Sequence, residues 1–553
     1  MTEYYDLGTY SRRVSTSSVD AQLWFDRGLR WCYGFNHEES VRCFRKTAEH
    51  DRDCAMAYWG IAYARGPNYN KAWEAFDEIE LPQAVKEAHS AATQALELAG
   101  RAAPVERALI EALQRRYPSD VPIEDCSIWN DDYADAMRNV HSQFPDDPDV
   151  ASLFAEALMN RTPWQLWDLK TGEPAEGADT LEAAEVLERA LQDVVATRGQ
   201  PHPGLLHMYV HLMEMSPHPE RALRAADALR DLVPDAGHLR HMPTHIDVLC
   251  GHYRDVVVSN EKAIAADRKY LEREGPYNFY SLYRCHDYHF KLYGAMFLGQ
   301  LRPALEAANE MIATLPEELL RVETPPMADW LEGFVPMKMH VLVRFGRWQD
   351  IVDEPLPDDQ ELFCVTTAMK HYAKAVAHAS RGELDAAEDH RREFHEAVAR
   401  VPPTRYVFNN TCLDILAVAA EMVNGEVEYR KGNFDVAFER LRRAVELDDN
   451  LTYDEPWGWM QPARHALGAL LLEQGQIEEA EAVYRADLGL DATLSRACQH
   501  PDNIWSLHGL HECLTALGKT GEAEILHQRL ELAVARADVP VRASCYCRLE
   551  RAA

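Results

Sequence analysis

Histidines are the residues of this chain whose types and spacing could support chemistry. The chain contains 24 His, and ten of them fall within residues 202–289. His207 and His211 stand four residues apart in HMYVH, so a helix presents both on one face. Two imidazoles one turn apart on a helix can bind one divalent ion. The pair is therefore a candidate metal-binding helix face.

Two further groups of histidines follow in the same region. His238 and His241 are three residues apart in GHLRHMPTHI, and His245 comes four residues after His241. His286 and His289 are three residues apart in YRCHDYHFKL. A single such pair in a repeat helix is more often a packed, hydrogen-bonded pair than a metal site, so packing remains the alternative for each. Three groups close together in sequence favour a shared site.

Clustered imidazoles with few carboxylates suit copper, iron, zinc or nickel, and they disfavour magnesium and calcium. The set is larger than one closed tetrahedral site needs, so it leaves room for an open position or for two neighbouring metals. His202, His218 and His252 stand beside Pro or in a turn, and we interpret them as turn residues. We expect copper or iron, with zinc as the alternative, on these ligands: His207, His211, His238, His241, His245, His286 and His289.

Polar and aromatic side chains in the expected turns are candidates for a substrate pocket. GFNHEES resembles a capping turn on physical grounds, and the Trp-containing breaks could equally fold back to stabilise the array. Trp is costly to expose, and apolar-aromatic walls with few polar groups are typical of small-molecule sites. We expect Glu38 and Tyr283 to be catalytic. The expected substrate-binding residues are His37, Asn70, Trp164 and Trp457.

Helix pairs must position these side chains. Residues 425–450, 463–488 and 504–533 each read as an amphipathic helix, a tight turn at Gly, and a second helix. This pattern resembles the tetratricopeptide repeat, in which small residues alternate with aromatic ones at fixed positions. Weaker copies, such as the one with Gly28 and Phe44, extend the pattern over most of residues 20–540, while 100–200 is helical without a clean repeat.

Strand signals are nearly absent. The sequence therefore predicts an all-α, right-handed tetratricopeptide-like solenoid of antiparallel helix pairs, forming one continuous superhelix. We divide it into an N-terminal region (1–200), a central His-rich region (201–400) and C-terminal repeats (401–553). Within the central region, Pro243 should start a new helix and hold Met242 extended. His245 would then face back toward His241.

The chain also resembles a subgroup of large bacterial and fungal tetratricopeptide-repeat proteins. The matching stretches are FNHEES, CAMAYWGIAYARGPNYN, HMPTHI and YDEPWGW, and they are spread over most of the length. The resemblance implies no settled reaction. It implies a curled superhelix in which His37, Glu38, Asn70 and the histidines of 207–289 converge on one interior cavity. Trp164 and Trp457 would line the same cavity.

Composition limits the partners. The chain is 47% hydrophobic and 27% charged, which is typical of a folded protein, and its net charge is −33. That charge argues against nucleic acid and against anionic membrane surfaces. No secretory signal or membrane span is evident, and scattered Cys favour a cytoplasmic protein. Cys545 and Cys547 are expected to be ordinary thiols.

Two functions follow from these observations. The first is a metal-dependent oxidoreductase that acts on a small organic or aromatic substrate inside the superhelix. The second is a non-catalytic scaffold whose concave groove binds a peptide or a partner protein. Repeated ladders of Lys, Arg and Asn, which a peptide groove would use, are not evident, and paired His would have no reason to recur there. The oligomeric state stays open.

Overall fold

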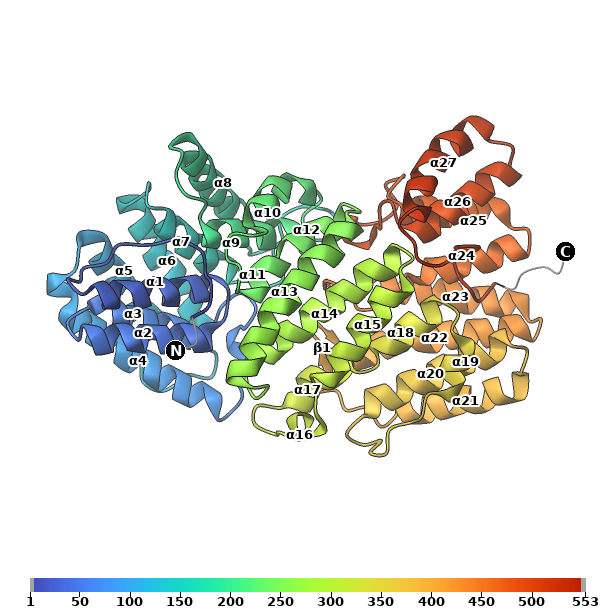
Figure 1. Cartoon of the computed structure of the whole chain (residues 1–553), viewed down its shortest axis with the longest axis horizontal. Coiled ribbons are helices and arrows are strands. Elements are labelled where there is room, and N and C mark those ends of the chain that lie inside the picture. Colours follow the sequence, from blue (N-terminus) through green and yellow to red (C-terminus); the bar gives the residue numbers. More distant parts are fainter. Residues whose placement is uncertain (1–3, 549–553) are drawn as a thin grey trace. The chain divides into compact units, whose positions relative to one another are not determined.

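The computed structural model describes residues 4–548, and almost all regular structure in them is helical (Figure 1). The strands in this range are β1 (Tyr406–Val407) and β2 (Asn410–Thr411), which form one short antiparallel pair. Consecutive helices pack in pairs, for example Val19–Tyr33 on His37–His50, Cys364–Ser380 on Leu384–Val398 and Cys412–Arg430 on Phe434–Asp449. The predicted all-α solenoid of antiparallel helix pairs is therefore confirmed.

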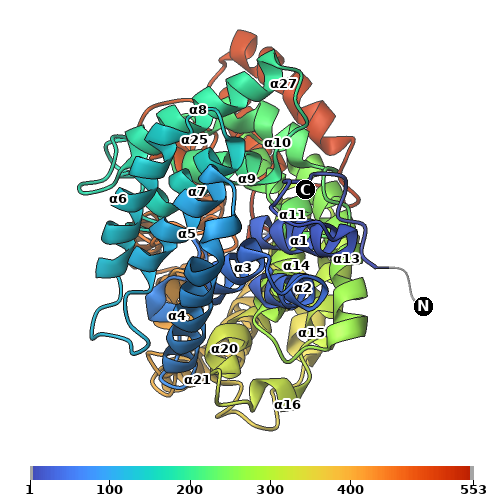
Figure 2. The same ribbon diagram turned by 90° about the vertical axis from the view of Figure 1, so that its left-hand side faces the viewer.

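The chain divides into two compact units. The first takes in residues up to Ile246 together with Lys262–Arg273, and its helices are visible from a second direction in Figure 2. The three regions predicted from the sequence stay a prediction. The helices of the first unit are α1 (Val19–Tyr33), α2 (His37–His50), α3 (Ala55–Arg65), α4 (Glu80–Leu98), α5 (Pro104–Arg116), α6 (Ile128–Gln143), α7 (Pro148–Met159), α8 (Thr180–Ala196), α9 (Pro203–Glu214), α10 (Leu223–Leu229) and α11 (Gly237–His241), with short 3-10 turns η1 (Trp73–Ala75), η2 (Ala99–Arg101) and η3 (Pro219–Ala222).

The second unit takes in Asp247–Glu261 and the chain from Glu274 onward. Two helices, α12 (Pro243–Leu249) and α13 (Tyr253–Glu274), contribute residues to both units. The others are α14 (Tyr280–Phe297), α15 (Leu301–Ala313), α16 (Glu317–Leu320), α17 (Met327–Leu331), η4 (Glu332–Phe334), α18 (Met337–Arg344), α19 (Trp348–Asp353), α20 (Cys364–Ser380), α21 (Leu384–Val398), α22 (Cys412–Arg430), α23 (Phe434–Asp449), α24 (Ala463–Glu473), α25 (Ile477–Asp487), η5 (Arg496–Cys498), α26 (Ile504–Ala516) and α27 (Thr520–Val534).

Aromatic rings seated against glycines hold neighbouring helices together. A Cβ atom on Gly28 would lie 2.8 Å from the Phe44 ring, and one on Gly60 would lie 2.5 Å from the same ring. Phe44 of α2 is thus clasped between α1 and α3, where only a residue without a side chain fits. Tyr484 of α25 is held in the same way between Gly468 of α24 and Gly509 of α26. This packing places small residues against aromatic rings between neighbouring helices, as the repeat pattern in the sequence predicts.

Glycine also ends the first helix of several pairs, as the sequence predicts. Gly432, Gly475 and Gly518 each follow a helix and have φ between 70° and 87°. In this left-handed region an L side chain is strained, so Gly allows the tight reversal into the second helix.

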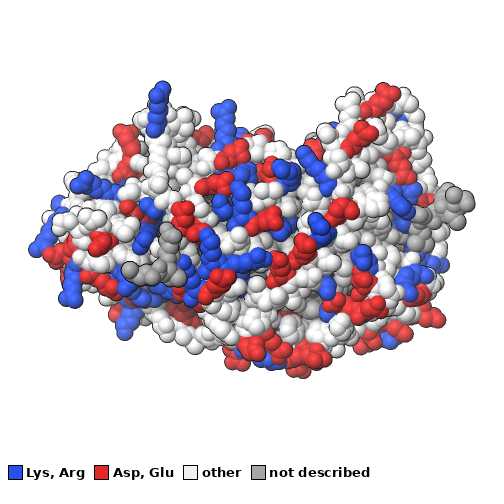
Figure 3. All heavy atoms as spheres, viewed as in Figure 1, with Lys and Arg blue, Asp and Glu red and all other residues white. Residues whose placement is uncertain are grey.

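The surface and the cysteines add three observations. On the face drawn in Figure 3, acidic and basic side chains are interspersed. Within residues 4–548 no helix has both the length and the apolar character needed to cross a bilayer. Cys545 and Cys547 are joined by a disulfide, so the expectation of two ordinary thiols was wrong.

The backbone at Met242 also differs from the prediction. Met242 has φ −49° and ψ −37°, which is helical, and its amide donates to the carbonyl of His238 at 2.9 Å. Pro243 disfavours helical geometry at the residue before it. That preference is overridden because Met242 is fully buried and completes a turn from α11 into α12. His238, His241 and His245 consequently follow a nearly continuous helical path.

Candidate metal centre

Helix α9 carries His207 and His211, and its first turn fixes where they lie. His202 caps the helix, since its Nδ1 accepts a hydrogen bond from the amide of Leu205 at 3.1 Å. Gly204 allows α9 to approach its neighbours closely, because a Cβ there would lie 2.5 Å from Oγ of Ser152 and 2.6 Å from the Tyr33 ring. This close approach brings His207 to Tyr33, the last residue of α1. His202 is a capping residue, in agreement with its interpretation as a turn residue.

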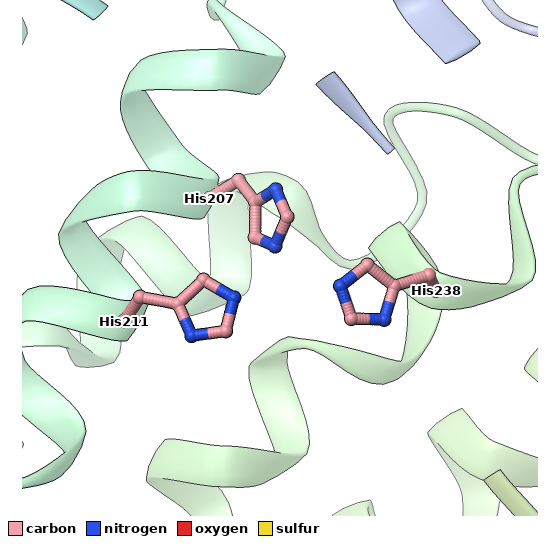
Figure 4. A group of neighbouring side chains, drawn as sticks. All are labelled: His207, His211 and His238. Carbon is pink, nitrogen blue, oxygen red and sulfur yellow. The ribbon is translucent and has the colours of Figure 1, made fainter. Parts of the chain in front are cut away.

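Three imidazoles, from α9 and α11, point toward one another in Figure 4. His207, His211 and His238 are fully buried, with at most 1% of each residue exposed. Each offers one ring nitrogen, and these nitrogens lie within 4.8 Å of one another. A tetrahedral ion with bonds of about 2.1 Å would hold them about 3.4 Å apart. Small side-chain rotations would therefore close the group around an ion.

The hydrogen bonds of the two α9 histidines fix their tautomers. Nδ1 of His207 donates to the carbonyl oxygen of Tyr33 at 2.7 Å. Nδ1 of His211 donates to Oε1 of Glu214 at 2.9 Å. A neutral ring protonated at Nδ1 keeps its lone pair on Nε2. Both Nε2 atoms are buried and have no hydrogen-bond partner among the described residues. This is the arrangement of a metal-binding His with an outer acceptor.

Burial keeps the three rings uncharged. It lowers the pKa of His207, His211 and His238 well below the ordinary value of 6.5. Neighbouring imidazoles lower each pKa further, because a proton on one ring would repel a proton on the next. Metal ions bind the neutral form of His. The group is therefore ready for a metal at neutral pH without first losing protons.

Aromatic rings surround the imidazoles. Phe35 lies with its ring centroid 4.5 Å from that of His207, and it stacks on His211 and His238 at 5.9 and 5.7 Å. Tyr69 and Trp164 contact His211 at centroid distances of 4.8 and 5.6 Å. Rings of this size exclude water and lower the local dielectric. The predicted substrate-binding residue Trp164 thus borders the histidine group, and its role stays a prediction.

Two of these rings are held by unusual backbone. Among residues 4–548, five non-glycine residues have positive φ, and they include Phe35 at 55° and Trp164 at 60°. Such a conformation costs a bulky residue about 1–3 kcal/mol and tends to occur at functional sites. The Trp164 amide donates to the Tyr69 hydroxyl at 3.2 Å, which anchors that turn. The fold therefore holds Phe35 and Trp164 against the histidines in backbone conformations that lower its stability.

A second pair of histidines is linked to the first through Glu214. Oε2 of Glu214 lies 2.8 Å from Nδ1 of His245. Nε2 of His245 lies 2.8 Å from Nε2 of His241, so one of these nitrogens carries the proton between them. His211, Glu214, His245 and His241 thus form a buried polar chain leading away from the three imidazoles. The sequence groups His238 with His241, whereas the structure places His238 with His207 and His211.

Four predicted residues lie in the second unit. Tyr283, His286 and His289 are all on α14 and buried. His286 packs on the Phe408 ring at 4.5 Å, and Nε2 of His289 lies 2.8 Å from Sδ of Met460. The indole of Trp457 donates to the carbonyl oxygen of Asp448 at 3.0 Å. Their predicted catalytic, metal-binding and substrate-binding roles stay predictions.

The remaining predicted residues lie near the first turn of α2. Glu38 is exposed there, and the preceding Asn36 caps the helix by accepting from the Glu39 amide at 3.2 Å. Nδ1 of His37 lies 3.4 Å from the Asn68 amide nitrogen, and Asn68 also organises the turn at Asn70. GFNHEES is thus a capping turn, and the predicted roles of Glu38, His37 and Asn70 stay predictions.

Sequence reasoning missed several parts of the site. The acceptor for His207 is the backbone carbonyl of Tyr33, which no side-chain pattern can indicate. Phe35 and Tyr69 stand in turns far from α9 in sequence. The available signals were a bulky aromatic directly after Gly34 and another two residues after Pro67, in turns where a polar residue is more usual.

Comparisons with known proteins give only distant structural similarities. No protein-family model matches this sequence, and no curated protein matches it. Among solved structures, it is similar to yeast Tom70, at 11% identity over 92% of this chain and 99% of that chain, with a TM-score of 0.29. It is also similar to the Cut9–Hcn1 hetero-tetramer of APC/C (13% identity, 89% and 76% covered, TM-score 0.30) and to Naa15/Naa10 bound to HypK-THB (13%, 93% and 70%, TM-score 0.22). Identities and TM-scores this low carry no functional assignment.

Proposed function

We propose that the first unit binds one transition-metal ion on His207, His211 and His238, and that the centre acts on a small organic molecule. The single observation that carries the proposal is the pair of buried Nε2 lone pairs on His207 and His211, which have no hydrogen-bond partner among the described residues. An unmet buried acceptor costs about 1–3 kcal/mol. A metal ion would satisfy both atoms at once.

The donor set argues for a centre with an open position. Three imidazoles leave one tetrahedral position for water or substrate, as in catalytic zinc sites. Copper, iron and zinc all accept imidazole nitrogen. Copper or iron is the favoured metal for the proposed oxidation, and zinc is the alternative. A bound metal would supply Lewis acidity or one-electron chemistry. Phe35, Tyr69 and Trp164 would provide apolar walls, which suit an aromatic or apolar substrate.

The residues of the chain would orient and shield this chemistry. Glu214 and the Tyr33 carbonyl hold two ligand rings with Nε2 directed inward. Burial raises the pKa of Tyr69 well above its ordinary value, so its hydroxyl keeps its proton. That hydroxyl accepts from the Trp164 amide and retains its own proton for donation.

The repeat architecture supports a second candidate, a scaffold that binds a protein partner. Stacked helical repeats present extended surfaces that suit this task, and on architecture alone this candidate has the stronger support. The buried histidine group is the observation that favours the first candidate. A scaffold would need no cluster of neutral, inward-directed imidazoles.

Metal analysis of the full-length protein distinguishes the candidates. Purified protein is reconstituted separately with copper, iron and zinc, passed through a desalting column and analysed for metal. The variants are His207→Ala with His211→Ala, and, as a matched control, His218→Ala, whose side chain is 65% exposed. Circular dichroism checks that each variant is folded.

We expect the double variant to lose one metal equivalent and the control to lose none. If wild-type protein and the double variant retain equal metal, the metal centre is wrong and the scaffold function remains. Capture of a partner protein by both wild type and the double variant, with no metal in either, would establish the scaffold instead.

A further inference from the structure

A second group of potential ligands lies in the other unit, between the two helices of one repeat. His371 is on α20, and His390 and Glu393 are on α21, three residues apart. The two helices are joined by a short turn at Gly382. His371 is buried, whereas the side chains of His390 and Glu393 are 24% and 44% exposed. The group is therefore open to ions from solution.

The three donor atoms form a small triangle. Nδ1 of His371 lies 3.0 Å from Nδ1 of His390 and 3.0 Å from Oε2 of Glu393. Nδ1 of His390 lies 3.3 Å from the same oxygen. Each side of the triangle is as short as a hydrogen bond.

Protons alone fit this triangle poorly. The ionised carboxylate has no proton to give, so any proton must come from the two nitrogens. If both nitrogens carry a proton, both can donate to Oε2 of Glu393, but two N–H groups then lie side by side across the short nitrogen–nitrogen side. If only one carries a proton, the other nitrogen presents a lone pair to the Glu393 oxygen. Every arrangement leaves one repulsive contact.

A metal ion removes that repulsion. With bonds of about 2.0–2.2 Å, a tetrahedral zinc ion holds its nitrogen and oxygen ligands about 3.3–3.5 Å apart. The observed sides of 3.0–3.3 Å are close to these separations. Two imidazoles, one carboxylate and a solvent position form a donor set that zinc uses in proteins.

Neighbouring groups hold the ligands in place. The ring of His378 stacks on His390 at 5.4 Å, and its Nδ1 lies 2.5 Å from Oε2 of Glu383. Lys374 directs its amine to backbone carbonyl oxygens of α19, at 2.6 Å from Val352, rather than to Glu393. The Glu393 carboxylate is thus available to the two histidines.

We propose that His371, His390 and Glu393 form a zinc site that ties α20 to α21, separate in its ligands from the trihistidine centre. The inference goes beyond the proposed function, because it neither uses nor requires His207, His211 or His238.

The experiment measures zinc on the full-length chain with His207→Ala and His211→Ala already introduced. This background removes the first centre, so failure of one proposal is distinguishable from failure of the other. The test variants are His390→Ala and the conservative Glu393→Gln, both at accessible positions. The matched control is His395→Ala, an exposed histidine on the same helix that lies near Asn424.

We expect the background protein and His395→Ala to bind one zinc equivalent. His390→Ala should lose it, with affinity reduced by more than the roughly 10–100-fold cost of losing an outer partner. Cobalt should give visible ligand-field bands in the control and not in His390→Ala. If the background protein binds no zinc, or if His390→Ala and Glu393→Gln bind as tightly as the control, the proposal is overturned.

Discussion

Nδ1 of His211 lies 2.9 Å from one carboxylate oxygen of Glu214, three residues later on α9. The other oxygen of that carboxylate lies 2.8 Å from Nδ1 of His245. One fully buried carboxylate thus lies within ion-pair distance of two imidazoles. Because the acceptor fixes the tautomer of His211, Glu214 controls which nitrogen faces the candidate centre.

Glu214→Gln should weaken metal binding by about 10–100-fold, the usual cost of losing an outer carboxylate. The amide keeps the volume but can accept on one atom only, so it cannot serve both His211 and His245. Competition with a chromophoric chelator measures the affinity. Glu220→Gln, an exposed partner of His218, is the control and should bind as wild type. Equal affinity in both variants would contradict the role of Glu214.

Gly204→Ala should destabilise the protein by about 1–3 kcal/mol, the usual cost of overpacking. The new Cβ would press on Ser152 and Tyr33, and the displacement of α9 would also lower metal retention. Urea unfolding measures the first effect and metal analysis the second. Gly100→Ala is the control, since a Cβ there meets nothing within 4 Å. A stable, metal-loaded Gly204→Ala protein would be inconsistent with the close approach of α9.

Phe35→Ala should open the histidine group to water. Loss of this buried ring should cost about 3 kcal/mol or more, and relief of its positive φ offsets part of that. Extraction of bound metal by a chelator should become faster, because Phe35 contacts all three rings. Phe434→Ala, at a ring that is 39% exposed, is the control. Unchanged extraction would mean that Phe35 does not shield the site.

His340 should make the protein less stable in mild acid. Burial against Trp459 lowers its pKa to about 3, whereas 6.5 is the ordinary value. Between these values the unfolded chain binds the proton and the folded chain does not, so stability falls as the pH falls below 6.5. At pH 5 the loss is about 2 kcal/mol from this group.

The matching experiment compares urea unfolding of wild type and His340→Leu at pH 7 and pH 5. The variant carries a packing cost that is the same at both pH values, but it lacks the titration. Its stability should therefore fall by about 2 kcal/mol less than that of wild type between the two. Equal losses in both proteins would show that His340 does not titrate on unfolding.

Repeat packing was predictable because it depends on residues near each other in sequence. The repeat pattern in the sequence includes Gly28 and Phe44, and the structure seats the Phe44 ring against Gly28. A different local rule, the extended backbone expected before a proline, failed at Met242. There burial and a continuing turn outweighed the preference set by Pro243.

The site was predictable only in its residue types. Spacing correctly placed His207 and His211 on one helix face, since that follows from helix geometry. It could not pair them with His238, because that depends on how α11 lies against α9. Nor could it show the Tyr33 carbonyl, which belongs to the backbone end of α1.

The seating of Phe35 has a consequence for protein engineering. Its ring covers the histidines, yet the residue belongs to the reversal that joins α1 to α2, some 170 positions earlier in the chain than His207. Swapping or deleting the opening repeat is a routine operation in modular repeat proteins. Here it would remove the Phe35 ring from the histidines. The turn between α1 and α2 therefore also covers the candidate metal centre, so the opening repeat cannot be exchanged independently of the histidines.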